Sequence, residues 1–81
     1  MNLNLIQGSY TTQEAIDLLH SLVNVKIKFH ENKISHSSSE EDIKMREERI
    51  KALQHDLAAV RYKIRNGQDK IEIKSTIDIK L

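Results

Sequence analysis

The chain has 81 residues, the size of one domain, so we expect a single domain over residues 1–81. It contains no cysteine, which excludes a disulfide framework and a cysteine-based zinc site. Charged residues make up 31% of the chain, yet the formal net charge is only +1, whereas proteins that hold nucleic acid through its phosphates are usually far more basic. A chain of this size buries a small core, so association with a second chain is the remaining route to stability.

The first predicted element is a short β-strand at residues 2–6. Leu3 and Leu5 alternate with asparagines there, and Gly8 is expected to end the strand. The four residues Thr11–Glu14 have the spacing of a capping box, in which a threonine hydroxyl and a glutamate satisfy backbone N–H groups at a helix start. A helix is therefore predicted over residues 12–34.

This first helix carries more apolar residues than one partner helix can cover. At about 100° per residue they fill an arc of roughly 200°. We therefore expect the helix to contact two surfaces, its hairpin partner and either a sheet or a second subunit. The apolar positions are Ala15, Ile16, Leu18, Leu19, Leu22, Val23, Val25, Ile27 and Phe29.

A polar connection at residues 35–39 separates this helix from a second one, predicted over residues 40–65. Ser39 is the expected N-cap, and the acidic residues that follow it favour a helix start. The second helix has an apolar seam with alternating spacings of three and four, in which Arg46 is the polar exception. Asn66 and Gly67 resemble a C-cap with glycine in the left-handed conformation. The two helices are predicted to form an antiparallel, coiled-coil-like hairpin.

The last eleven residues change to a period of two, which predicts a strand over residues 71–81. Its odd-numbered positions are apolar apart from Ser75, and its even-numbered positions are polar. The fold class is therefore mainly α, in the order β-α-α-β, with a longer strand at the C-terminal end. Because this strand is about twice the length predicted for residues 2–6, its surplus edge favours a homodimer.

Three polar residues on the inner faces of the hairpin are candidates for partner binding: Lys26, His30 and Arg46. In an antiparallel hairpin turning near Ser37, facing residue numbers sum to roughly 75. Lys26 should then face residues 47–50, where its ammonium could pair with Glu47 or meet solvent, and Arg46 should lie near His30 and Phe29. The structural interpretation is packing of the lysine stem and a cation–π contact of Arg46; the functional one is a buried binding site.

Residues that would carry catalysis or bind a cofactor are not apparent. None of the four histidines stands four residues from another, and two isolated glycines cannot form a phosphate-binding loop. The serines follow no nucleophile pattern. We expect no catalytic, cofactor-binding or metal-binding residues, no cofactor and no enzymatic activity.

The sequence also bears on membranes and nucleic acid. Its apolar runs are far shorter than the roughly 20 residues of a membrane span, and residues 1–6 lack the basic segment of a signal peptide, so we expect a cytoplasmic protein without membrane contact.

A strand followed by two helices is also the order in β-ribbon repressors, where Asn2, Asn4 and Gln7 could contact bases. The helices are about twice too long for that class, and the first strand has no basic residue, so nucleic acid is not the expected partner.

Several segments carry a family resemblance: Gly8, Glu14-Ala15, Val25–His30, Glu41–Ile50 and Ser75–Ile79. Over nearly the whole chain, the sequence resembles a group of small uncharacterised bacterial proteins of β-α-α-β pattern. That group has no assigned activity, cofactor or partner. The resemblance implies a bacterial, cytoplasmic protein and assigns no functional residue.

The function most consistent with these features is a homodimeric helical scaffold or protein-interaction module, with the chain itself and possibly another protein as partners. A nucleic-acid-associated regulator, built as a β-ribbon-like dimer, is the alternative.

Overall fold

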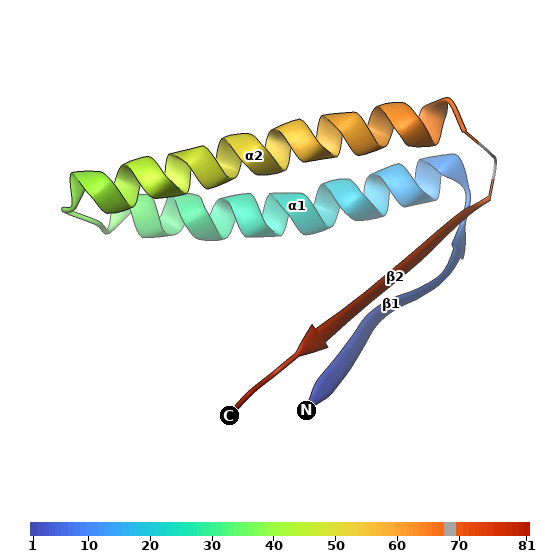
Figure 1. Ribbon diagram of the computed structural model, residues 1–81, viewed down its shortest axis with the longest axis horizontal. Helices are drawn as coiled ribbons and strands as arrows, with labels where there is room; N and C mark the ends of the chain where they lie inside the picture. The colour runs from blue at the N-terminus through green and yellow to red at the C-terminus, as the bar shows by residue number, and fades with distance from the viewer. Residues whose placement is uncertain (68–69) are drawn as a thin grey trace.

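The computed structural model describes residues 1–67 and 70–81. Its elements are β1 (Asn2–Tyr10), α1 (Thr12–Ser35), α2 (Glu40–Arg65) and β2 (Ile71–Asp78). Figure 1 shows the two helices side by side as an antiparallel hairpin, with the two strands leaving together from the end opposite its turn. The predicted helical hairpin is confirmed, and α2 has the predicted bounds.

The helix starts follow from local sequence. At α1, Thr11 Oγ1 accepts a hydrogen bond from Glu14 N at 3.2 Å, and Glu14 Oε1 accepts one from Thr11 N at 2.9 Å, which completes the capping box. Ser39 Oγ accepts from Asp42 N at 3.3 Å at the start of α2. The prediction that Gly67 is left-handed is wrong, because no glycine has a positive φ among the described residues. Gly67 follows α2 closely, and a Cβ at this position would lie 3.0 Å from the Lys63 carbonyl oxygen.

The two strands form one antiparallel ribbon, and β1 is longer than predicted. It has nine residues against eight in β2, and the pairing runs from Asn2 opposite Asp78 to Tyr10 opposite Ile71. The prediction that β1 ends before Gly8 is wrong because Gly8 pairs with Ile73 inside the ladder. The surplus edge that the sequence suggested for the C-terminal strand is therefore absent up to Ile79, whose backbone also bonds to Met1.

An irregularity at Leu5 decides which side chains of β1 face inward. The register shifts between Asn4 and Ile6, so Leu5 is an extra residue without a partner, as in a β-bulge. Leu3 and Ile6 then share one face of the ribbon although they are three residues apart. Ile6 is buried with 7% exposure, whereas Leu5 is 46% exposed. Simple alternation through Leu3 and Leu5 would have given the opposite assignment.

The core is small and lies where the ribbon joins the helices. Ala15 and Ile16 of α1 and Ile64 of α2 are buried together. Four partly buried residues pack against them: Tyr10, Leu19, Ile71 and Ile73. Farther along the ribbon, the apolar residues Leu3 and Ile77 are 48% and 41% exposed. The packing that fixes the ribbon on the helices is thus confined to the half of the ribbon that lies nearest the helices.

The molecule is flat. Its Cα atoms extend over 46 × 33 × 13 Å, so the shortest dimension is less than half of either of the others. In Figure 1, which looks down this axis, α2, α1 and the ribbon follow one another in the plane of the picture. Most domains place two packed layers around a core. Here, α2 lies beside α1 along the hairpin, and the ribbon packs against the first turns of α1.

Candidate functional site

The structure joins two of the three candidate residues, His30 and Arg46, through a contact between their side chains. Arg46 Nη1 lies 3.2 Å from His30 Nδ1, and Arg46 Nε donates to Asp42 Oδ2 at 3.3 Å. Their residue numbers, 30 and 46, sum to 76, close to the predicted 75. Arginine only donates, so His30 Nδ1 must be the acceptor and the ring proton must sit on Nε2. Arg46 thus links the start of α2 to a histidine of α1.

His30 is buried with 5% exposure and sits among cations. Its pKa is lowered from 6.5, chiefly because burial disfavours the charged ring and then because Arg46, Lys26 and Arg49 repel a proton there. A neutral His30 suits its role as acceptor from Arg46. The site is therefore a neutral histidine held between two helices, with positive charge around it.

Lys26 is exposed rather than buried. It lies at a hollow of about 240 Å³ with His30, Arg49 and Asp56. Of the two surroundings expected for its ammonium, Glu47 and solvent, the structure shows solvent, since in residues 1–67 and 70–81 the one ion pair is that of Arg46 with Asp42. Exposure of Lys26 removes the premise of a buried lysine site; a partner-binding role for Lys26, His30 and Arg46 stays a prediction.

The predicted contact of Arg46 with the Phe29 ring is also replaced by another. Lys33 Nζ lies 5.6 Å from the centroid of that ring, one turn along the same helix. The ring of His30 packs edge-on against Phe29 with centroids 6.0 Å apart. Arg46 turns to His30 instead because the neutral imidazole offers it a hydrogen-bond acceptor, which the phenyl ring does not.

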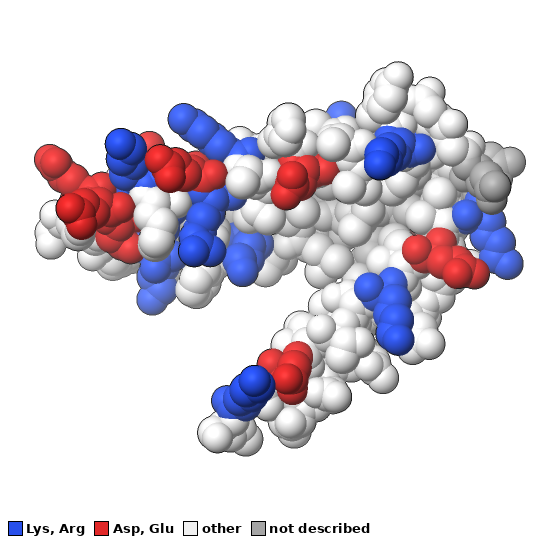
Figure 2. All heavy atoms as spheres, viewed as in Figure 1, with Lys and Arg blue, Asp and Glu red and all other residues white. Residues whose placement is uncertain are grey.

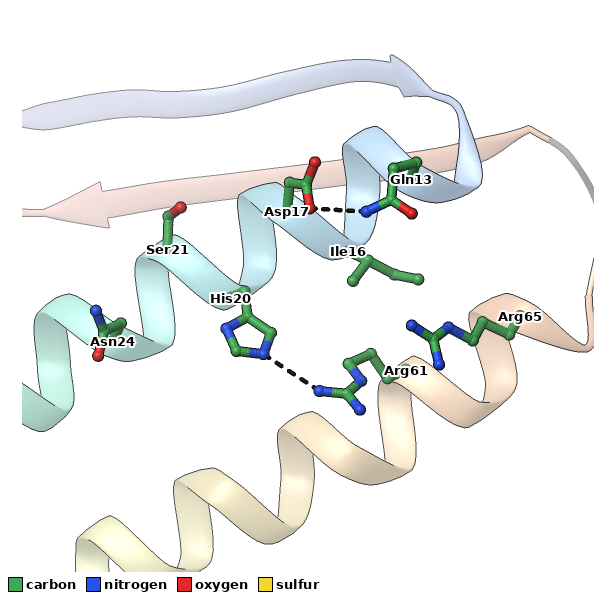
Figure 3. A pocket seen from close by; sticks show the side chains of 8 residues that line it. All are labelled: Gln13, Ile16, Asp17, His20, Ser21, Asn24, Arg61 and Arg65. Atoms are coloured by element: carbon green, nitrogen blue, oxygen red, sulfur yellow. Dashed lines mark hydrogen bonds between the residues drawn. The ribbon is translucent and has the colours of Figure 1, made fainter.

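A second polar site, which the sequence did not indicate, lies toward the other end of the hairpin. An open cleft of about 540 Å³ is bordered by α1 and the last turns of α2. In it, Arg61 Nη1 lies 3.2 Å from His20 Nε2, and Arg65 reaches the same space (Figure 3). The sequence feature that could have indicated this site is the pair of arginines four residues apart, which places both on one face of the second helix.

A row of apolar residues runs along α1, which we call the outer stripe: Leu18, Leu22, Val25 and Phe29. At about 100° per residue, it lies roughly 110° around the helix from the residues that face α2. Leu18 and Leu22 are partly buried, whereas Val25 is 69% and Phe29 53% exposed. The prediction that α1 contacts two surfaces is confirmed for α2 along the hairpin and, at Ala15 and Ile16, for the ribbon. Val25 and Phe29 of the outer stripe remain exposed in the protomer.

Charges of both signs are mixed over the surface. On the face drawn in Figure 2, groups of basic and acidic residues lie next to one another on the helices and along the ribbon. The polar face of the ribbon pairs Gln7 with Lys74 and Asn4 with Thr76, but also Asn2 with Asp78. This mixed pattern differs from the continuous basic surface with which proteins usually contact the phosphates of nucleic acid.

Two further properties concern metals and membranes. In the part of the chain that the structure describes, no three histidine or acidic side chains come close enough together to hold a metal ion. Neither described helix combines the length and apolarity that crossing a membrane requires.

Comparison with known proteins gives no relative from which a function could be carried over. No family model, no curated protein and no solved structure matches this chain.

Proposed function

We propose that this protein is a non-enzymatic scaffold that acts as a homodimer, with the outer stripe of α1 at the centre of the interface. The exposed apolar residues of the distal ribbon, Leu3 and Ile77, extend the interface. In this arrangement, the second copy covers apolar side chains that the single protomer leaves exposed.

The observation that carries the proposal is the surface area of the single chain. It exposes 6604 Å², whereas a compact monomer of 9.4 kDa exposes about 5,000 Å². The excess is about 1,600 Å² per chain, so a dimer that removed it would bury about 3,200 Å² in total. Obligate homodimers bury about 2,000–5,000 Å², which is the range this value falls in.

The buried core is correspondingly thin. Across the described residues, four apolar side chains are buried, namely Ile6, Ala15, Ile16 and Ile64, and no large side chain is fully enclosed. Small domains with so little core usually depend on a partner, a metal or a disulfide. The sequence has no cysteine and so cannot form a disulfide. A partner that packs against the exposed apolar residues would supply the missing stability.

A second copy of the chain fits the outer stripe better than an unrelated surface does. The stripe has spacings of four, three and four residues, the pattern by which helices pack side by side. Two antiparallel copies can meet about a two-fold axis between Leu22 and Val25, which brings Leu18 of each copy toward Phe29 of the other. Such a contact is self-complementary and closes after two subunits, as in most soluble oligomers.

The test is the mass in solution, measured by light scattering after gel filtration at micromolar concentration. The wild-type chain should have twice the 9.4 kDa mass of one chain. Val25→Glu should be a folded monomer, because it places a charge in the interface at a residue that is exposed in the protomer. Asn24→Glu is the matched control: it makes the same charge change at the neighbouring residue on the polar side, and it should remain dimeric. A wild-type monomer with a cooperative melt would refute the proposal.

A further inference from the structure

The cleft between the first half of α1 and the end of α2 has the composition of an anion site. Its side chains include Gln13, Asp17, His20, Asn24, Arg61 and Arg65. Figure 3 shows the two guanidinium groups reaching from α2 into the space beside Ile16 and His20 of α1. The cleft lies on the polar flank of α1, away from the outer stripe, so its occupation is independent of dimer formation.

Among the residues that the structure describes, the two arginines in this cleft have no acidic partner. In the described parts of the chain, neither Arg61 nor Arg65 forms an ion pair, since the ion pair found there is that of Arg46. Asp17 borders the same cleft, but its Oδ1 accepts a hydrogen bond from Gln13 Nε2 at 2.8 Å. Two cations four residues apart on a helix repel one another. The attraction of cations to a helix C-terminus explains their position in α2 but not why both turn into one cleft.

Arg61 also has an incomplete set of hydrogen bonds. Its Nη1 is paired with His20, while its Nε is buried and has no hydrogen-bond partner in residues 1–67 and 70–81. A buried donor without a partner is costly, and guanidinium groups are best satisfied by a two-pronged contact with an oxyanion. An anion bound between the two guanidinium groups would offset their repulsion, and a movement of Arg61 toward it would give Nε a partner.

We propose that this cleft binds the phosphate group of a small phosphate monoester, with Arg61 and Arg65 as the two charged donors. Arginine forks match the geometry of phosphate oxygens, and two guanidinium groups suit a group that carries up to two negative charges. The amides of Gln13 and Asn24 are further donors at the border. A volume of about 540 Å³ exceeds what a phosphate group needs and leaves room for the organic part of the ligand.

The experiment is a titration of the full chain, labelled with ¹⁵N, followed by backbone amide shifts in NMR spectra. Three probes separate the sources of binding: inorganic phosphate, adenosine 5′-monophosphate and adenosine. Phosphate should give saturable shifts in residues 13–24 and 61–65, the monophosphate should bind more tightly than phosphate, and adenosine should not bind. Equal affinity for the first two would show a site for free phosphate, which would overturn the monoester assignment.

Matched variants decide whether the arginines are responsible. Arg65→Gln and Arg61→Gln should each weaken monophosphate binding at least tenfold. Lys63→Gln removes the same charge from an exposed residue on another face of the same turns and should leave the affinity within twofold of wild type. Arg65 is exposed, so its variant should keep the wild-type spectrum outside the cleft, which shows that it is folded. The absence of saturable shifts, or equal weakening by Lys63→Gln, would overturn the proposal.

Discussion

Arg46 Nη1 of α2 lies 3.2 Å from Nδ1 of His30 on α1, so a charged residue in one helix depends on an uncharged residue in the other. The same guanidinium holds Asp42 in the first turns of α2. His30 can accept this bond only while its Nδ1 carries no proton. Protonation of His30 would therefore turn a hydrogen bond inside the hairpin into a contact between two cations.

The stability of the protein should fall as the pH is lowered below about 6.5. The pKa of His30 in the folded chain is below its value of 6.5 in the unfolded chain, because burial, Arg46, Lys26 and Arg49 oppose protonation. The unfolded chain therefore takes up the proton first, so the stability present above pH 6.5 is lost progressively toward the folded-state pKa. Melting temperatures measured between pH 7 and pH 5 should show this decrease.

The matched variants for this effect are His30→Gln and His55→Gln. Glutamine at position 30 keeps an oxygen that can accept from Arg46 but does not titrate, so the decrease between pH 6.5 and pH 5 should shrink. His55 is exposed on the outside of α2, and its replacement should leave the decrease unchanged. An identical pH profile in both variants would show that His30 is not the group responsible.

Lys26→Met should leave stability at pH 7 within about 0.5 kcal/mol of wild type, because Lys26 is exposed. It also removes one of the three cations that lower the pKa of His30, so that pKa should move back toward 6.5. The titration of the His30 ring protons by NMR measures this shift directly. Lys28→Met makes the same change on the polar side of α1, and a shift of equal size there would contradict the assignment.

The bulge at Leu5 predicts unequal effects of two neighbouring truncations. Ile6→Ala should cost roughly 2–5 kcal/mol of unfolding free energy, because Ile6 is 7% exposed and its removal leaves a cavity. Leu5→Ala should cost less than about 1 kcal/mol, since that side chain is 46% exposed. Urea denaturation of both variants measures the difference. A larger cost at Leu5 would mean that β1 alternates regularly and that the register differs from the one described.

Ile77→Asp and Asp78→Asn test the ribbon's share of the proposed interface. Ile77 lies beyond the small core and is 41% exposed in the protomer, so a charge there should allow folding but dissociate the dimer. Asp78 lies on the opposite face and is exposed, so its replacement should change stability by no more than about 0.5 kcal/mol and leave the dimer intact. Sedimentation and circular dichroism separate dissociation from unfolding. Equal behaviour of the two variants would remove the ribbon from the interface.

The sequence by itself determined the features that depend on near neighbours. The capping box at Thr11, the N-cap at Ser39 and both helices could be predicted, because each requires residues only a few positions apart. The approach of His30 to Arg46 also followed, because a short connection fixes which turns of two antiparallel helices lie opposite.

Only the tertiary structure decided the features that join distant parts of the chain. The pairing of β1 with β2 carries the strand through Gly8 and creates the bulge that buries Ile6, which no local pattern predicts. His20 meets Arg61, with residue numbers that sum to 81 rather than about 75, because helical side chains lean toward the N-terminus and arginine is long enough to span a turn. Burial likewise depends on the whole arrangement: a flat molecule leaves Lys26 and Val25 exposed on an arc that periodicity alone would assign to a core.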